Sequence, residues 1–122
     1  MQGIGRLAMT ATQPSGQSAT RLAVVDLRQR LELVAINAVN DSFPTQSVLV
    51  EQIQIRQRLA FIVVAYPKKA TLSELIGMLR VARHIYSRTS DVLHGRSSMV
   101  NLSAVLLDEW DTFVRRIEQL AR

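Results

Sequence analysis

Apolar residues recur along most of this chain at the three- and four-residue spacing of an amphipathic helix, and this periodicity limits the possible folds more than any other feature. Breaks interrupt the pattern at Pro44, at Pro67 and around Gly95. Proline cannot continue a helix and glycine is common just beyond a helix end, so each break separates two helices. The 122 residues therefore predict one all-α domain, an antiparallel four-helix bundle with short connections.

The beginning of the chain lacks this pattern. Residues 1–19 are rich in Gly, Thr, Gln, Ser and Ala, and we expect them to form a flexible leader to a helical-bundle domain over 20–122. The first helix is expected from residue 20 to about residue 40, where Asn40-Asp41-Ser42 and Pro44 end it.

The second segment, about 46–66, has an ambiguous pattern. Phe61-Ile62-Val63-Val64 is β-branched and is compatible with a buried strand. However, the segment runs for about twenty residues without Gly or Pro, and polar residues interleave through its first half. Its length favours a buried helix that ends before Pro67.

The last two helices have clearer signals. Thr71 and Glu74 have the spacing of a capping box at the start of the third helix. The last helix follows Gly95-Arg96-Ser97-Ser98. Apolar stripes on these two helices predict one shared core, formed by Leu79, Tyr86, Leu106, Trp110, Phe113 and Ile117.

Composition excludes several kinds of site. The chain has no cysteine and only two histidines, His84 and His94, which excludes disulfides, thiolate metal sites and His-rich metal sites. We therefore expect neither a metal nor another cofactor. No apolar run approaches the roughly 18 residues of a membrane span, and the N-terminus does not resemble a secretory signal. We expect a soluble, cytoplasmic protein that does not bind membranes.

The net charge of +5 is concentrated in one region. Residues 56–96 carry eight basic side chains but only two acidic ones, Glu74 and Asp91. Such a block suits a polyanionic partner such as RNA, although a solvated basic face is an equally good interpretation. The candidate nucleic-acid-binding residues are Lys68, Lys69, Arg83 and Arg96.

The region from Tyr86 to Arg96 is a polar interruption between two apolar helical patterns. It contains Arg88 and His94, whose fixed charge and titratable imidazole suit phosphodiester chemistry. Ser90 or Asp91 is positioned to support either residue. In the alternative interpretation, these are ordinary polar residues that stabilise a helix end.

Arg88, five intervening residues and His94-Gly95 resemble the Arg–spacer–His motif of HEPN domains, a family of small all-helical domains found in toxins, defence systems and RNA-processing proteins. The segment from Thr71 to Ile76 also resembles the Thr-Leu-Gly-x-Leu-Ile opening of the helix that precedes that motif. Two positions depart from the family pattern. Thr89 stands where many active members have Asn, Asp or His, and Arg96 where one toxin subgroup has Tyr.

The resemblance implies a metal-independent endoribonuclease that acts as a homodimer. Arg88 and His94 from two copies would meet in a shared cleft, and a cognate protein partner such as an antitoxin would be expected. The alternative is a non-catalytic helical module for dimerisation or for binding a protein partner. A DNA-binding role is weaker because no helix-turn-helix signal is present.

Overall fold

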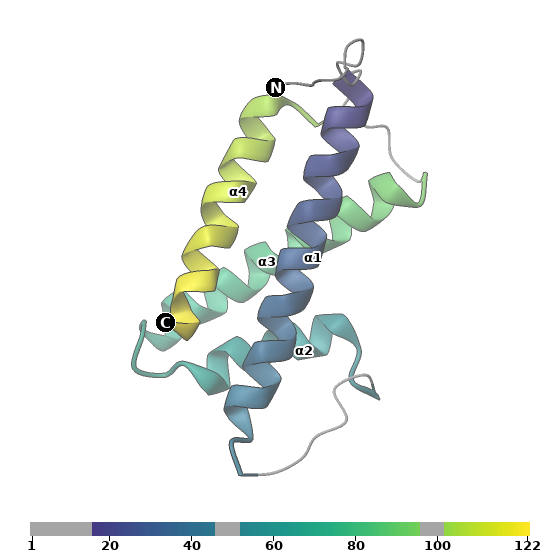
Figure 1. Ribbon diagram of the computed structural model, residues 1–122. Helices are drawn as coiled ribbons and strands as arrows, with labels where there is room; N and C mark the ends of the chain where they lie inside the picture. The colour runs from purple at the N-terminus through teal and green to yellow at the C-terminus, as the bar shows by residue number, and fades with distance from the viewer. Residues whose placement is uncertain (1–15, 46–51, 96–101) are drawn as a thin grey trace, which may run out of the picture.

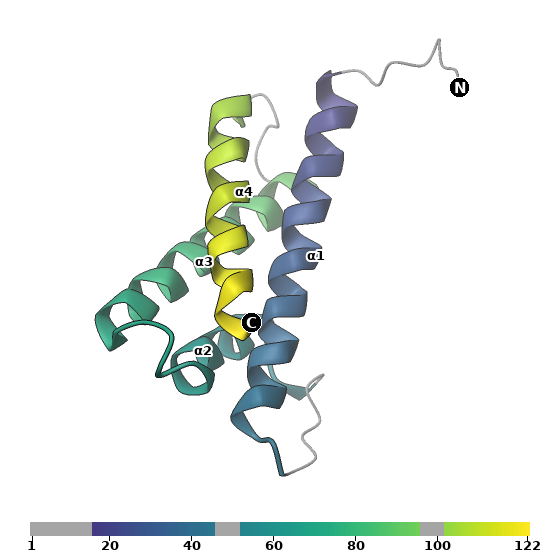
Figure 2. The same cartoon turned by 60° about the vertical axis from the view of Figure 1, so that its left-hand side comes forward.

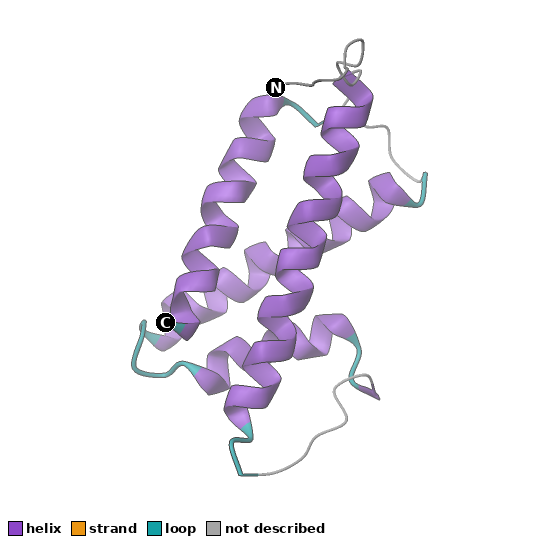
Figure 3. Cartoon of the chain, in the orientation of Figure 1, coloured by secondary structure: helices purple, strands orange, loops and turns teal. Residues whose placement is uncertain are grey.

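The computed structural model describes residues 16–45, 52–95 and 102–122, and within these ranges all regular structure is helical (Figure 3). The expected all-α domain with four helices is therefore confirmed. The helices are α1 (Gly16–Ser42), α2 (Ile55–Ala65), α3 (Leu72–Leu93) and α4 (Ala104–Glu118), and a short 3₁₀ helix, η3 (Gln119–Ala121), follows α4.

Helix α1 is the longest helix, and the other helices are arranged around it (Figure 1). The other three helices pack against it, and α3 carries the chain back toward the end where α1 begins. Helix α4 then lies beside α1 and points in the same direction, in both Figure 1 and Figure 2. The four helices therefore do not alternate in direction along the chain, as they would in the expected antiparallel bundle. Helix α2 has only 11 residues, about 16 Å, which is too short to return the chain along the whole of α1.

Two helix boundaries differ from the prediction. Helix α1 begins at Gly16, four residues before the expected start, so only 1–15 of the proposed leader lies outside the described residues. Helix α2 begins at Ile55, whereas a start near residue 46 was expected. Its two buried residues, Leu59 and Ile62, both lie in this shorter segment and give it a face that packs on the core. Residues 46–51 lie outside the described residues.

The third boundary correction concerns the expected polar interruption after Tyr86. Helix α3 continues without a break to Leu93. Tyr86, Thr89 and Val92 are all buried and continue the helical stripe. Thr89 is fully buried, and its hydroxyl donates to the carbonyl of Tyr86 at 2.9 Å. A residue of a polar type therefore occupies a core position. The polar composition of this segment wrongly predicted an interruption of the helix.

Side-chain caps begin the last two helices. Thr71 Oγ1 accepts from the Glu74 backbone N–H at 3.2 Å, and Glu74 Oε1 accepts from the Thr71 N–H at 2.9 Å. This confirms the predicted capping box. Ser103 starts α4 in a similar way, because its hydroxyl accepts from the Leu106 N–H at 3.1 Å. Each cap satisfies backbone donors that have no partner within the helix.

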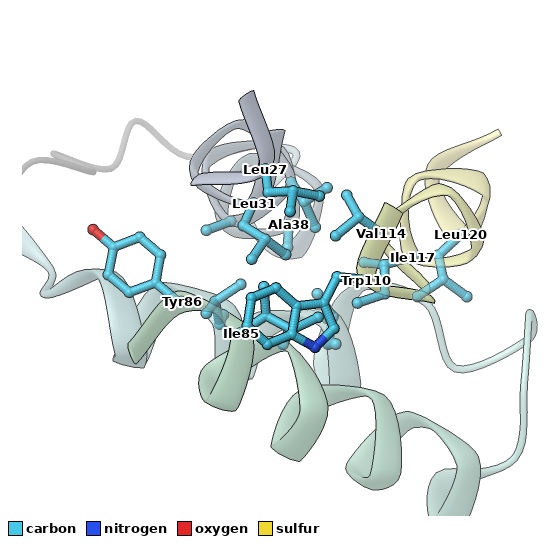
Figure 4. Packing of buried hydrophobic residues seen from close by; sticks show 14 of the residues in the cluster. Leu27, Leu31, Ala38, Ile85, Tyr86, Trp110, Val114, Ile117 and Leu120 are labelled. Carbon is cyan, nitrogen blue, oxygen red and sulfur yellow. The ribbon is translucent and has the colours of Figure 1, made fainter. Parts of the chain in front are cut away.

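The core includes residues of all four helices, and Figure 4 shows the part of it that lies between α1, α3 and α4. Leu31 of α1, Ile85 of α3 and Ile117 of α4 are almost completely buried there. All six residues of the predicted shared core belong to this cluster. Tyr86, Trp110 and Ile117 are buried, and the partly buried members are Leu79, Leu106 and Phe113.

An ion-pair network fixes α4 against α1. Arg30 of α1 contacts Asp111 at 2.6 Å and Glu118 at 2.9 Å, both on α4. It also pairs with Asp26 on its own helix at 3.2 Å. The hydrogen bond to Glu118 is the largest of the effects that raise the pKa of Arg30 above its ordinary value. The hydrogen bond from Arg30 in turn lowers the pKa of Asp111.

Candidate nucleic-acid interface

His94 forms the C-cap of α3 and is exposed to solvent. Its Nδ1 lies 2.8 Å from the carbonyl oxygen of Ser90. A carbonyl oxygen can only accept a hydrogen bond, so the proton of the neutral ring must be on Nδ1. Nε2 then keeps its lone pair and can accept a proton. The geometry matches a helix-end cap, and it also leaves one nitrogen available for chemistry.

Arg88 is directed toward α4. Its guanidinium carbon lies 5.9 Å from the centre of the Trp110 ring, within the range of a cation–π contact. His94 follows six residues later, which on a helix is about 9 Å along the axis and about 240° around it. Within one chain, therefore, the structure does not bring Arg88 and His94 together.

Ser90 and Asp91, the proposed supporting residues, lie inside α3 and are both half-buried. Ser90 contacts His94 through its backbone carbonyl. The contact between Ser90 and His94 is therefore of the kind that is found at the end of a helix.

The predicted nucleic-acid-binding residues are dispersed. Lys68 and Lys69 are exposed in the turn before α3, and Lys69 Nζ donates to the backbone carbonyl of Arg122. Arg83 lies on α3, where its Nε and Nη2 donate to the carbonyl of Arg56 at 3.0 and 2.8 Å. Arg96 lies outside the described residues.

A shallow depression of about 340 Å³ is lined by basic side chains from α2 and α3, together with Ser87. We call its four basic residues the basic face; they are Arg56, Arg80, Arg83 and His84. No carboxylate lines the depression. The edge of the His84 ring approaches Trp110, with the centroids 6.4 Å apart.

Helix periodicity explains why these side chains converge. Positions 80, 83, 84 and 87 follow the i, i+3, i+4, i+7 spacing of one helix face, opposite the buried Ala82 and Ile85. Arg56 joins them from the first turn of α2, which contains no acidic residue. Like charges at these spacings destabilise an isolated helix by about 0.2–0.5 kcal/mol per pair, and a bound polyanion would relieve this repulsion.

Sequence reasoning missed three of the four residues of the basic face. Arg80 and His84 share the helical spacing of Arg83, so the sequence contained a signal for them. Arg56 is 27 positions from Arg83 along the chain. Its place in the depression depends on how α2 packs on α3, which periodicity does not report.

Other kinds of site were sought in the part of the chain that the structure describes. There, no group of three or more His, Asp or Glu side chains is arranged to hold a metal ion. None of the described helices combines the length and the hydropathy needed to cross a membrane.

In comparisons with known proteins, no family model, no curated protein and no solved structure matches this chain.

Proposed function

We propose that this domain binds RNA through the basic face. The observation that carries the proposal is the convergence of three arginines and a histidine on one depression that no carboxylate lines. Arginine is well suited to phosphate because its planar guanidinium can donate two parallel hydrogen bonds. The depression is also open to solvent along an exposed helix face, as an extended strand of phosphates requires.

The test compares two charge reversals by fluorescence anisotropy with a labelled single-stranded RNA. Arg80→Glu changes an exposed residue of the basic face, and Arg21→Glu makes the same charge change on α1. We expect Arg80→Glu to weaken binding about tenfold or more and Arg21→Glu to have a much smaller effect. Between about 50 and 200 mM salt, the salt dependence of binding should also be shallower in Arg80→Glu. Equal losses in the two variants would show only general attraction to a basic protein.

A second candidate function is cleavage of the bound RNA by Arg88 and His94, as the resemblance to HEPN domains implies. The observation that favours it is His94, which is exposed and has Nε2 available as a base. In this mechanism the 2′-oxygen attacks the adjacent phosphorus while His94 takes the proton of the 2′-OH. The bond from phosphorus to the 5′-oxygen of the next nucleotide breaks, and that oxygen takes a proton from water. Arg88 stabilises the charge that develops on the phosphate. A guanidinium can keep its face on an aromatic ring while its N–H edges donate to phosphate.

The two residues would have to come from different copies of the chain, because they do not converge within one copy. The cleavage hypothesis therefore requires a homodimer. A DNA analogue of the same sequence should resist cleavage because it lacks the 2′-OH. Cleavage should also survive EDTA, because the mechanism uses no metal.

Arg88→Ala and His94→Ala should each abolish RNA cleavage while the RNA affinity stays within about threefold of that of the unmodified chain. The control is Ser73→Ala, which changes an exposed residue on α3 outside the depression. If both variants cleave as well as the unmodified chain, Arg88 and His94 do not catalyse the cleavage. If neither RNA binding nor cleavage is detected, the remaining interpretation is a non-catalytic module for dimerisation or for binding a cognate protein partner.

A further inference from the structure

The first half of the outer surface of α4 carries the opposite charge to the basic face, and the exposed Arg115 and Arg116 follow about one turn later. A shallow depression of about 370 Å³ there is lined by Val105, Asp108, Glu109 and Thr112, all exposed. These four residues, which we call the acidic face, lie on the side of α4 opposite the buried Trp110. Val105 is 69% exposed, the largest fraction among the exposed large hydrophobic side chains of the described residues.

The two faces share a sequence pattern as well as complementary charge. On α3, Ile76 is followed four residues later by Arg80 and seven residues later by Arg83. On α4, Val105 is followed at the same intervals by Glu109 and Thr112. In both helices, an exposed aliphatic residue therefore lies one turn before an exposed charge, with opposite signs on the two helices.

We propose that a second copy of this chain docks its acidic face on the basic face of the first. With α4 of one copy parallel to α3 of the other, Val105 lies against Ile76 and Glu109 lies opposite Arg80. Asp108 is then placed near Arg83. The contact buries two aliphatic side chains that one copy alone leaves in water, and it pairs charges that have no opposite charge within either depression.

The chain offers a clean charge-swap experiment. Within the described residues, the side chains of Arg80 and Glu109 make no hydrogen bond or ion pair, so reversing either charge should leave the fold intact. Arg80→Glu and Glu109→Arg should each lower self-association, measured by sedimentation velocity at micromolar concentrations and low salt. An equimolar mixture of the two variants should recover it, because the arginine introduced in one variant then meets the glutamate introduced in the other across the interface. The unmodified chain should sediment above its monomer mass of 13.7 kDa.

Three results would overturn the proposal. One is an unmodified chain that stays monomeric, and another is a Glu109→Arg variant that associates like the unmodified chain. The third is a mixture in which association does not recover. Circular dichroism spectra of both variants should match the spectrum of the unmodified chain, which excludes misfolding as the cause of lost association. Arg21→Glu is the control for net charge and should associate normally.

The self-association proposal does not rest on RNA binding, and the same variants separate the two. Arg80→Glu should weaken both RNA binding and self-association. Glu109→Arg should weaken self-association alone, because Glu109 lies outside the basic face. A result in which Glu109→Arg loses self-association and keeps its RNA affinity supports both proposals at once.

Discussion

At the scale of single residues, Thr89 explains one departure from the HEPN pattern. The position after Arg88 faces the core, and Thr89 has no exposed surface there. Its hydroxyl is satisfied by the Tyr86 carbonyl, one turn back on the same helix. Asn and Asp are close to threonine in volume but carry more polar groups, and His is larger, so each would bring an additional polar group into this buried site. In this chain, the residue after the arginine therefore contributes to packing.

Two substitutions of Thr89 should distinguish the contribution of its volume to stability from the contribution of its hydroxyl. Thr89→Val keeps the volume and removes a hydroxyl whose partner carbonyl also lies in the helix, so the free energy of unfolding should change by less than about 1 kcal/mol. Thr89→Asn should cost about 1–3 kcal/mol because it buries an amide in a site that fits a threonine. Urea denaturation followed by circular dichroism measures both values. A Thr89→Asn variant as stable as the unmodified chain would show that this site is not tightly packed.

Trp110 joins the core to the candidate functional residues. It is 6% exposed, and both Arg88 and His84 contact its ring. Trp110→Ala should cost about 3–5 kcal/mol of unfolding free energy, because it removes a large buried side chain and leaves a cavity. Chemical denaturation followed by circular dichroism is the suitable measurement, since the variant has no tryptophan to report fluorescence. A loss below about 1 kcal/mol would contradict the burial seen here.

At the scale of elements, local signals predicted the helices better than their ends. The capping box at Thr71 could be predicted because its two partners are only three residues apart. The shared core could be predicted from the apolar stripes on α3 and α4. The end of α3 was not readable, because a buried threonine looks polar in sequence. The direction of α4 relative to α1 also escaped prediction, because it depends on the length of α2. The full basic face could not be predicted for a similar reason, because Arg56 is brought to it by the packing of α2 on α3.

The Arg30 network should dominate the docking of α4 on α1. Its side chain is only 20% exposed, and it holds carboxylates of both helices. Arg30→Met keeps much of the aliphatic volume but removes the cation of Glu118 and leaves Asp111 with the exposed Arg115 alone. We expect a loss of about 1–3 kcal/mol in the free energy of unfolding at neutral pH. Arg115→Met is the matched control, because Arg115 pairs with the same Asp111 but is 70% exposed, and it should cost well under 1 kcal/mol.

The same network predicts a specific pH dependence. Arg30 lowers the pKa of Asp111 in the folded state, so Asp111 stabilises the fold when it is ionised. This contribution is complete above the ordinary carboxyl pKa of about 4 and is lost as the pH falls through the lower folded-state value. Between neutral pH and about pH 3, the unmodified chain should therefore lose more stability than Arg30→Met. Parallel stability curves for the two proteins, measured by thermal denaturation, would contradict this role of Asp111.

At the scale of the whole molecule, Arg80 belongs to two proposed contacts, one with RNA and one with a second copy. Both contacts depend on charge, and both should weaken as salt rises and shortens the range of electrostatic attraction. They also compete, because one guanidinium cannot serve both at once. Adding an excess of single-stranded RNA should therefore shift the sedimentation profile from associated to single chains bound to RNA. Coexistence of RNA with undiminished self-association would show that the two contacts use different surfaces.

The pairing of Arg30 with Glu118 also has a consequence for the order of folding. These residues are 88 positions apart in the chain, and α4 is synthesised after α1, α2 and α3. Helices α1, α2 and α3 are neighbours in sequence and can associate early, since short loops close at little entropic cost. The face of α1 that receives α4 stays uncovered until α4 itself has been synthesised. We therefore expect a nascent chain that ends before Ala104 to expose the apolar surface that α4 later covers, and so to be the stage of synthesis most prone to aggregation.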